Sequence, residues 1–133
     1  METLKIQSAI DTPEVIFDPQ SLFFSISGIS HPENAKEFYT RILIWLDEFF
    51  ERNQQTTLGV VTMELSFRYI NSSSYKYLRE ILRKLTVFHK KGFQIEVVWK
   101  YQTDDEDLLE EGQVLLGLPD IKLTHRFEAV DNI

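Results

Sequence analysis

A cluster of hydroxyl groups at Asn71-Ser72-Ser73-Ser74 is the feature of this sequence best suited to regulatory chemistry. The cluster follows an alternating segment, Met63 to Ile70, and precedes a segment with helical periodicity. A serine at such a junction commonly accepts a hydrogen bond from one of the first unpaired backbone N–H groups of the helix, and one serine suffices for this role. The other hydroxyls lie where backbone donors and the positive end of the helix dipole can also receive a phosphate. We therefore consider the cluster a candidate phosphorylation switch.

The composition predicts one domain and excludes several kinds of chemistry. A chain of 133 residues with 43% hydrophobic residues is large enough for one core, so we expect a single domain over residues 1–133. There is no cysteine, which removes thiol nucleophiles and thiolate metal sites. His31, His89 and His125 are far apart in the sequence, and no nucleotide-binding or EF-hand motif occurs. We expect neither a metal nor a cofactor.

The charge of the chain favours a protein partner. A net charge of −7 disfavours nucleic acid, since binding to phosphate backbones requires clustered Lys and Arg. No apolar run approaches the roughly 20 residues that span a bilayer, and the first residues lack the apolar region of a signal peptide. The acidic run from Asp104 to Asp107 is expected at the start of a helix and lacks the ligand spacing of a cation site. We expect a cytoplasmic protein that binds other proteins and not membranes.

The hydrophobic periodicity predicts an α/β fold. Alternating segments predict strands at Thr12 to Asp18, Leu22 to Ser27, Met63 to Ile70, Phe93 to Tyr101 and Lys122 to Val130. Helices are expected after a capping box at Ser30-His31-Pro32-Glu33, after the serine cluster, and after a second capping box at Thr103-Asp104-Asp105-Glu106. The order β-β-α-β-α-β-α-β predicts a mixed sheet of about five strands, with an antiparallel first hairpin followed by parallel crossovers.

The alternation also predicts where the helices pack. Strands covered on both faces are continuously apolar, whereas these strands have a polar residue at every second position, so the helices should lie mainly on one face. The inner face should include Met63, Leu65, Phe67 and Tyr69, and Trp99, Tyr101 and a core histidine, His125, should face inward in the later strands. The outer face should be solvated or form an interface, and it carries Glu64, Arg68, Glu96, Lys100, Arg126 and Glu128.

Two motifs resemble a known family. The segment Ser30-x-Pro32-Glu33-Asn34 opens the first long helix, and Tyr69-Ile70-Asn71-Ser72-Ser73-Ser74 ends the central strand. Together with the following amphipathic helix, they resemble the SiaC family of bacterial regulatory phosphoproteins, which look like distant relatives of STAS-domain anti-anti-sigma factors. The resemblance covers nearly the whole chain from about Thr12 and implies a STAS-like fold.

The resemblance implies a partner-switching function. A histidine-kinase-like Ser/Thr kinase would phosphorylate one hydroxyl, a PP2C-type phosphatase would remove the phosphate, and the unmodified form would bind and activate a diguanylate cyclase, raising cyclic di-GMP. The threonine that is modified in the family falls on Ser72, and three consecutive serines leave Ser73 and Ser74 as alternatives. An anti-sigma-factor antagonist acting on a kinase-like anti-sigma factor is the alternative function.

The residues around the serines also have structural interpretations. Asn71 either caps the helix or orients the loop for the kinase, and Glu33 and Asn34 either cap the first helix or contact a partner beside the loop. With Tyr69, Ser73 and Ser74, these residues form the predicted switch loop and partner-binding site. A serine hydrolase would need a general base beside the hydroxyl, and the sequence offers only Glu33 or a distant histidine. We therefore expect a binding protein without enzymatic activity.

Overall fold

The computed structural model describes residues 1–133 as a sheet of six strands and three helices. The first hairpin and its edge strand comprise β1 (Leu4–Ile6), β2 (Glu14–Asp18) and β3 (Phe23–Ser30). The remaining elements alternate as α1 (Ala35–Arg52), β4 (Val61–Ile70), α2 (Ser72–Lys90), β5 (Ile95–Gln102), α3 (Glu106–Leu116) and β6 (Thr124–Val130). The expected order of helices and strands is confirmed, with β1 as an addition.

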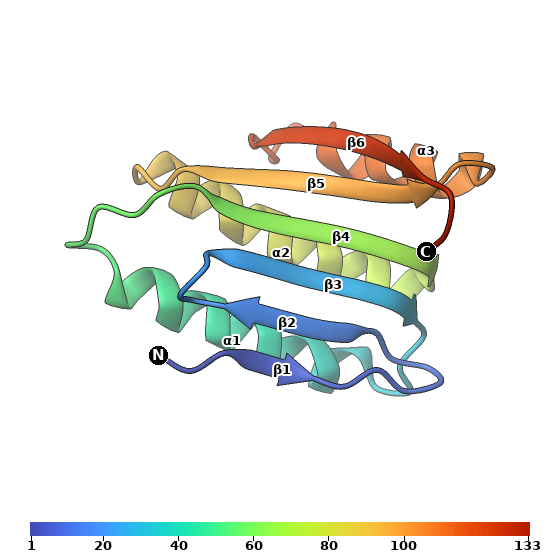
Figure 1. The fold of residues 1–133 in the computed structure, drawn as a ribbon, viewed down its shortest axis with the longest axis horizontal. Helices are drawn as coiled ribbons and strands as arrows, with labels where there is room; N and C mark the ends of the chain where they lie inside the picture. Colours follow the sequence, from blue (N-terminus) through green and yellow to red (C-terminus); the bar gives the residue numbers. More distant parts are fainter.

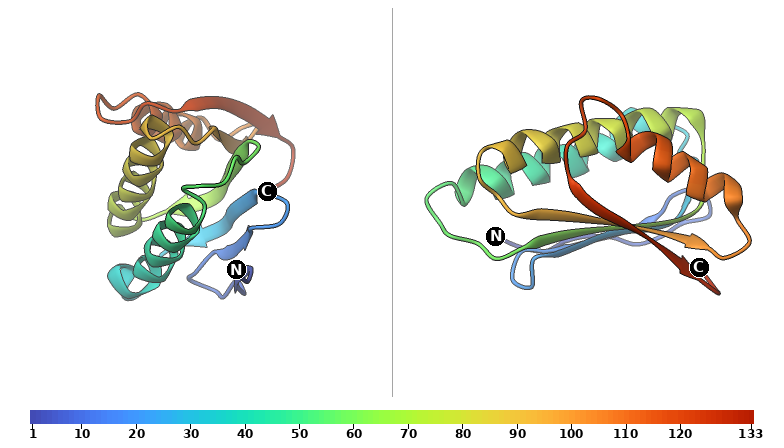
Figure 2. Two further views of the ribbon diagram at one scale, coloured as in Figure 1. Left: turned by 90° about the vertical axis from the view of Figure 1, so that its left-hand side faces the viewer. Right: turned by 90° about the horizontal axis from the view of Figure 1, so that it is seen from above.

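The sheet is mixed and its strands lie in sequence order. β1, β2 and β3 pair antiparallel, whereas β3 to β6 pair parallel. The three helices lie on one side of the sheet, which leaves the other side uncovered (Figures 1 and 2). This arrangement confirms the one-sided packing that the alternating strands predict.

The strand β1 is the element that the sequence did not reveal. It has only three residues, and Leu4, Lys5 and Ile6 pair with Phe17, Ile16 and Val15 of β2. Three residues are too few for an alternation to stand out, and such a short strand is formed by its neighbour's free backbone groups and not by its own propensity. It extends the predicted sheet from five strands to six.

An aromatic cluster fills the core between the sheet and the first two helices. Phe17 and Phe24 of neighbouring strands stack at 5.1 Å, and Trp45 of α1 meets both rings edge to face. Further along the same helix, Phe50 stacks on Phe88 of α2 at 4.5 Å. These contacts join α1 to both the sheet and α2, so both long helices turn an apolar face toward the core.

The alternation of β4 changes phase near its end. Phe67 is 1% exposed, but Tyr69 is 49% exposed and Ile70 faces inward instead. The register with β3 shifts at this point, because Gly28 pairs with Phe67 and Ile29 with Tyr69, and Gly28 has φ of +116°. Such a bulge bends a strand and redirects its side chains. The prediction that Tyr69 faces the core is therefore wrong.

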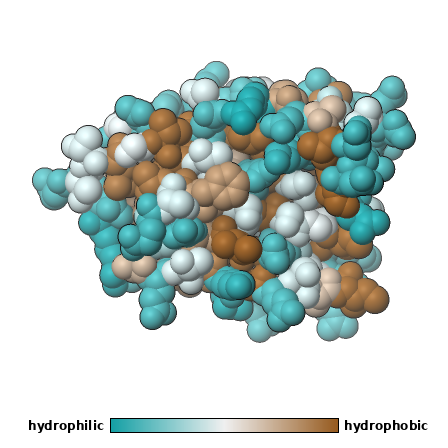
Figure 3. Space-filling view, in the orientation of Figure 1, coloured by the Kyte–Doolittle hydropathy of each residue, from teal (hydrophilic) through white to brown (hydrophobic).

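The uncovered face of the sheet is held by ion pairs between neighbouring strands. Lys100 pairs with Glu64, and Arg126 pairs with Glu96 and, at 3.8 Å, with Glu128. Val98 lies on this face, yet it is only 3% exposed. Its register partners are Glu64 and Arg126, whose long side chains stand on either side of it. The face is largely hydrophilic, with separate hydrophobic patches (Figure 3).

The prediction of a core histidine in the last strand is also wrong. His125 is exposed, and its Nδ1 lies 2.8 Å from the carbonyl oxygen of Leu123. Leu123 is buried but precedes β6. Because β6 is an edge strand, one of its flanks is open to solvent, and alternation alone does not ensure burial there. Trp99 is buried as expected, and Tyr101 is half-buried.

We expect Gly112→Ala to destabilise the fold although alanine favours helices. Gly112 is buried in α3, and a Cβ at this position would lie 2.5 Å from the indole of Trp99, whose Nε1 donates to the carbonyl oxygen of Leu108. Overpacking of this kind typically costs about 1 to 3 kcal/mol, more than the gain of about 1 kcal/mol in helix propensity. Urea unfolding measures the difference. Gln113→Ala, at an exposed site in the same helix, is the control, and equal stability of the two variants would contradict the packing argument.

Candidate functional site

The serine cluster lies at the edge of the sheet where the parallel strands end. Each of β3, β4 and β5 is followed by a helix, so α1, α2 and α3 all begin at this edge, on the right in Figure 1. The backbone N–H of Asn71 donates to the carbonyl oxygen of Ser30 at 3.0 Å, which joins the ends of β4 and β3. We call the segment from Asn71 to Ser74 the switch turn.

The three serines of the switch turn have different environments. Asn71 is the N-cap of α2, and its Oδ1 accepts a hydrogen bond from the backbone N–H of Ser74 at 2.9 Å. Ser72 and Ser73 are exposed in the first helical turn, whereas Ser74 is fully buried. The cap is therefore asparagine, and the hydroxyls of Ser72 and Ser73 are not needed for capping.

A chain of buried hydroxyl groups holds Ser74. Its Oγ donates to the carbonyl oxygen of Ser30 at 3.3 Å and accepts from Ser30 Oγ at 2.8 Å. Ser30 Oγ lies 2.5 Å from the hydroxyl of Tyr39. Since the only hydroxyl hydrogen of Ser30 points to Ser74, Tyr39 must be the donor in this contact. Tyr39, Ser30 and Ser74, all 0% exposed, thus form a directed chain from α1 through β3 to α2.

The start of α1 differs from the prediction. Ser30 belongs to β3 and does not cap the helix; the cap is Asn34, whose Oδ1 accepts from the backbone N–H of Glu37 at 3.0 Å. The capping box between Ser30 and Glu33 is therefore wrong, because the N-cap lies four residues after the serine and α1 begins at Ala35. Glu33 and Asn34 are exposed and line a groove of about 440 Å³ between α1 and the loop before β2. The third helix is capped by Asp105 and not by Thr103, so the capping box predicted from Thr103 to Glu106 is also wrong.

Tyr69 joins this groove to the switch turn. Its ring lies 5.8 Å from the ring of His31, and the backbone N–H of His31 donates to the carbonyl oxygen of Asp11 at 2.8 Å. All three residues are exposed. Exposed residues therefore follow one another from the loop at Asp11 through His31 to Tyr69, and the exposed Ser72 comes three positions after Tyr69 in the sequence. The bulge at Gly28 brings Tyr69 to the surface.

The other side of the switch turn is acidic. Tyr75 lies near Glu111 of α3, and burial together with this carboxylate raises the pKa of Tyr75. Burial likewise raises the pKa of Glu111, with a further contribution from Asp105 and Asp107. One oxygen of Glu111 is buried without a hydrogen-bond partner.

Two kinds of site are not found in the structure. No group of three or more His, Asp or Glu side chains is placed to hold a metal ion. None of the three helices combines the length and the apolar composition that a membrane span requires.

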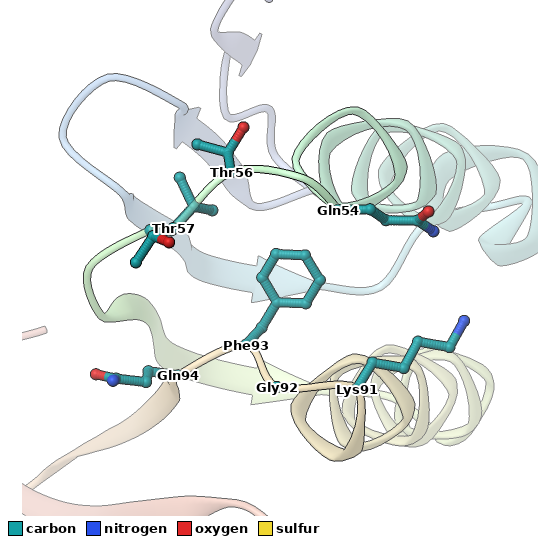
Figure 4. A pocket seen from close by; sticks show the side chains of 8 residues that line it. Gln54, Thr56, Thr57, Lys91, Gly92, Phe93 and Gln94 are labelled. Atoms are coloured by element: carbon teal, nitrogen blue, oxygen red, sulfur yellow. The ribbon is translucent and has the colours of Figure 1, made fainter.

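A second hollow lies at the opposite end of the sheet. It encloses about 200 Å³ between the loop after α1 and the segment that joins α2 to β5, and its lining includes Thr57, Lys91 and Gln94 (Figure 4). Phe93 points into it and also packs against Phe50. No pair of side chains there is arranged as a nucleophile and a base, so the hollow is a gap over the aromatic core.

The hydroxyl chain is the part of the site that the sequence did not predict. Tyr39 lies in the segment that the sequence predicts as the first long helix, and Ser30 is predicted as the cap of that helix. The only available signal was that a tyrosine in the middle of a core-facing stripe must find a partner for its hydroxyl. The distant partner could not be identified, because Ser30 and Ser74 are 44 positions apart in the sequence.

The fold and this edge define a class of α/β domains with helices on one face of the sheet and exposed hydroxyls at a strand-to-helix junction. The model of the SiaC family of regulatory phosphoproteins matches residues 6–123. The chain belongs to this family.

Similar proteins are found in Pseudomonas aeruginosa. An uncharacterised protein of strain UCBPP-PA14 is 29% identical over 110 residues, which are 83% of this chain and 84% of that protein. The crystal structure of apo-SiaC has a TM-score of 0.84 at 26% identity and covers 97% of this chain and 100% of that one. SiaC in complex with the diguanylate cyclase SiaD, which it activates, has a TM-score of 0.86 at 26% identity, with 96% and 99% coverage.

We predict that Asn71→Ala weakens the start of α2, whereas Asn71→Asp does not. The alanine variant loses the acceptor for the N–H of Ser74, a change that typically costs about 1 kcal/mol. Aspartate retains an oxygen acceptor and adds a charge that the helix N-terminus favours. Chemical denaturation of both variants, with the exposed Ser73→Ala as control, measures the effect. Equal losses in both Asn71 variants would contradict the capping role.

The buried tyrosine predicts an alkaline loss of stability. Burial raises the pKa of Tyr39 from 10.0 to about 12. Between these values the unfolded chain has lost a proton that the folded protein keeps, so the free energy of unfolding falls as the pH rises. Tyr39→Phe should show a shallower fall between about pH 10 and pH 11 in urea unfolding. Tyr69→Phe, which removes an exposed tyrosine, is the control; parallel curves for wild type and Tyr39→Phe would contradict the assignment.

Proposed function

We propose that this protein is a phosphorylation-controlled partner switch whose unmodified form binds and activates a diguanylate cyclase. In this proposal, a histidine-kinase-like Ser/Thr kinase phosphorylates Ser72 in the cytoplasm and a PP2C-type phosphatase reverses the reaction. The protein itself has no catalytic role. The observation that carries the proposal is the exposed Ser72 at the N-terminus of α2 in a chain of the SiaC family.

The likeness to a cyclase activator supports the choice of partner. SiaC of Pseudomonas aeruginosa is the activator of the diguanylate cyclase SiaD, and its structure in that complex aligns with 96% of this chain. This likeness favours a cyclase over an anti-sigma factor as the target. The exposed surface formed by Tyr69, His31 and the switch turn is the part of this chain that we assign to the partner, with Glu33 and Asn34 at its margin.

The environments of the serines favour Ser72 as the modified residue. The resemblance of Asn71-Ser72-Ser73-Ser74 to the family motif aligns the modified threonine with Ser72. Ser73 is also exposed and is the alternative, whereas Ser74 is buried and its hydroxyl hydrogen is used by Ser30. A kinase must reach the oxygen that it modifies, so Ser74 is the least suitable of the three.

The free fold should tolerate the phosphate. A phosphoserine adds about −1.5 to −2 charges, and at a helix N-terminus the dipole and the free N–H groups stabilise such a charge by about 0.3 to 1 kcal/mol. Lys76, one helical turn after Ser72 and exposed, lies on the same side of the helix. A partner that covers Ser72 must instead desolvate or pair the new charge, which commonly costs several kcal/mol. The modification therefore acts on binding and not on stability.

The test is to measure the binding of a diguanylate cyclase from the same organism to four forms of the protein. Unmodified wild type and Ser72→Ala should bind, whereas protein with phosphoserine incorporated at position 72 should bind at least about 100-fold more weakly. Ser21→Ala, at an exposed serine in the turn between β2 and β3, is the control and should bind like wild type. Calorimetry gives the affinities, and thermal unfolding should show similar stability for all forms. Equal affinity of the phosphorylated and unmodified proteins would refute the proposal.

A further inference from the structure

We propose that Tyr39 and Ser30 are positioning residues of the switch: their buried hydroxyls hold Ser74, so that the first turn of α2 presents Ser72 and Ser73 outward and keeps Ser74 out of reach. This inference rests on the proposed function, because it assigns the residues that determine which serine is modified. Neither Tyr39 nor Ser30 is exposed, and neither would touch the kinase or the cyclase.

Every hydroxyl hydrogen in the chain of Tyr39, Ser30 and Ser74 has an acceptor. Tyr39 donates to Ser30 over 2.5 Å, Ser30 to Ser74 over 2.8 Å, and Ser74 to the carbonyl oxygen of Ser30. Each hydroxyl hydrogen is used once, and the last acceptor belongs to the backbone. Buried hydrogen bonds in series strengthen one another, and an unpaired hydroxyl in such a place is costly. Ser74 is therefore held in one orientation.

The same residues also hold the backbone of the switch turn. The carbonyl oxygen of Ser30 accepts from the backbone N–H of Asn71 as well as from Ser74 Oγ, so one group fixes both ends of the turn. Asn71 in turn caps Ser74 through its side chain and accepts from the N–H of Tyr75 through its carbonyl oxygen at 3.0 Å. The hydroxyl chain thus connects α1 to Asn71 and Ser74, the first and last residues of the switch turn.

The position of the tyrosine ring is fixed independently of its hydroxyl. Tyr39 stacks on Tyr77 of α2 with ring centroids 5.8 Å apart and planes 2° from parallel, and Phe38 meets it edge to face. Removing the hydroxyl of Tyr39 should therefore leave the packing of α1 against α2 intact. Tyr77 is half-buried, and its hydroxyl takes no part in the hydrogen-bonded chain of Tyr39, Ser30 and Ser74. Tyr77→Phe is therefore a matched control, because it removes the same chemical group from the neighbouring ring.

The decisive measurement is amide hydrogen exchange by NMR on the unmodified protein. In Tyr39→Phe and in Ser30→Ala, the amides of Asn71, Ser74 and Tyr75 should exchange up to about tenfold faster than in wild type, the loss expected for one buried hydrogen bond. The amides of the central strands should change less. Tyr77→Phe should leave the three amides as in wild type. Equal exchange in Tyr39→Phe and Tyr77→Phe, or an acceleration spread evenly over the whole protein, would overturn the inference.

Phosphate mapping tests the consequence for site selection. With the kinase and ATP, fragmentation spectra of wild type should place the phosphate on the exposed serines alone. Ser30→Ala removes the hydrogen bond that Ser74 Oγ accepts and leaves only its bond to the backbone carbonyl oxygen of residue 30. In this variant phosphate should also appear on Ser74, and the KM for the protein substrate should rise several-fold with little change in kcat. Ser30→Ala modified at the same residues with the same KM would contradict the role. If no variant accepts phosphate, the proposed function fails, and the exchange measurement alone decides the inference.

Discussion

The order of the strands is the constraint on which the rest of the structure depends. From β3 onward, each strand is added beside the previous one on the same side, and the order never reverses. Parallel crossovers have one hand, so helices that follow one another in a constant direction must all lie on the same face of the sheet. Folds with helices on both faces need a reversal of direction. The uncovered face of this sheet is therefore a consequence of its topology.

The same constraint gathers the helix N-termini. A helix in a crossover begins where its strand ends, and here three helices begin at one edge of one sheet. Positive dipole ends and unpaired N–H groups are concentrated there. The first two helices are capped by asparagine and the third by aspartate. The exposed Ser72 and Ser73 are therefore not needed to cap α2. The carboxylates of α3 are negatively charged, in contrast to the positive N-termini of the helices. They would repel a phosphate on the α3 side of the switch turn, so an added phosphate is stabilised only on the side away from α3.

Much of this fold could be predicted from the sequence, because periodicity reports burial. Both long helices, five of the six strands and the one-sided packing follow from alternation and from apolar stripes. The errors share a cause: local patterns were extended across points where tertiary contacts change them. Ser30 has the spacing of a cap but lies in a strand, Tyr69 continues an alternation that a bulge interrupts, and His125 alternates in a strand whose edge is open. Nothing in the flanking residues of these three positions reports the neighbouring strand or its register.

The three consecutive serines look alike in the sequence but have two different roles in the structure: Ser74 is a buried structural residue, whereas Ser72 and Ser73 are exposed. A serine that is buried and hydrogen-bonded at both its donor and acceptor sites contributes to the position of the turn, and its modification would require local unfolding. An exposed serine two residues earlier on the same helix can gain a charge with little effect on the fold. The two depend on each other, because a partner can detect a single added phosphate only if the turn that carries it has one conformation. Rigidity at Ser74 is thus the physical condition for the switch that we propose at Ser72.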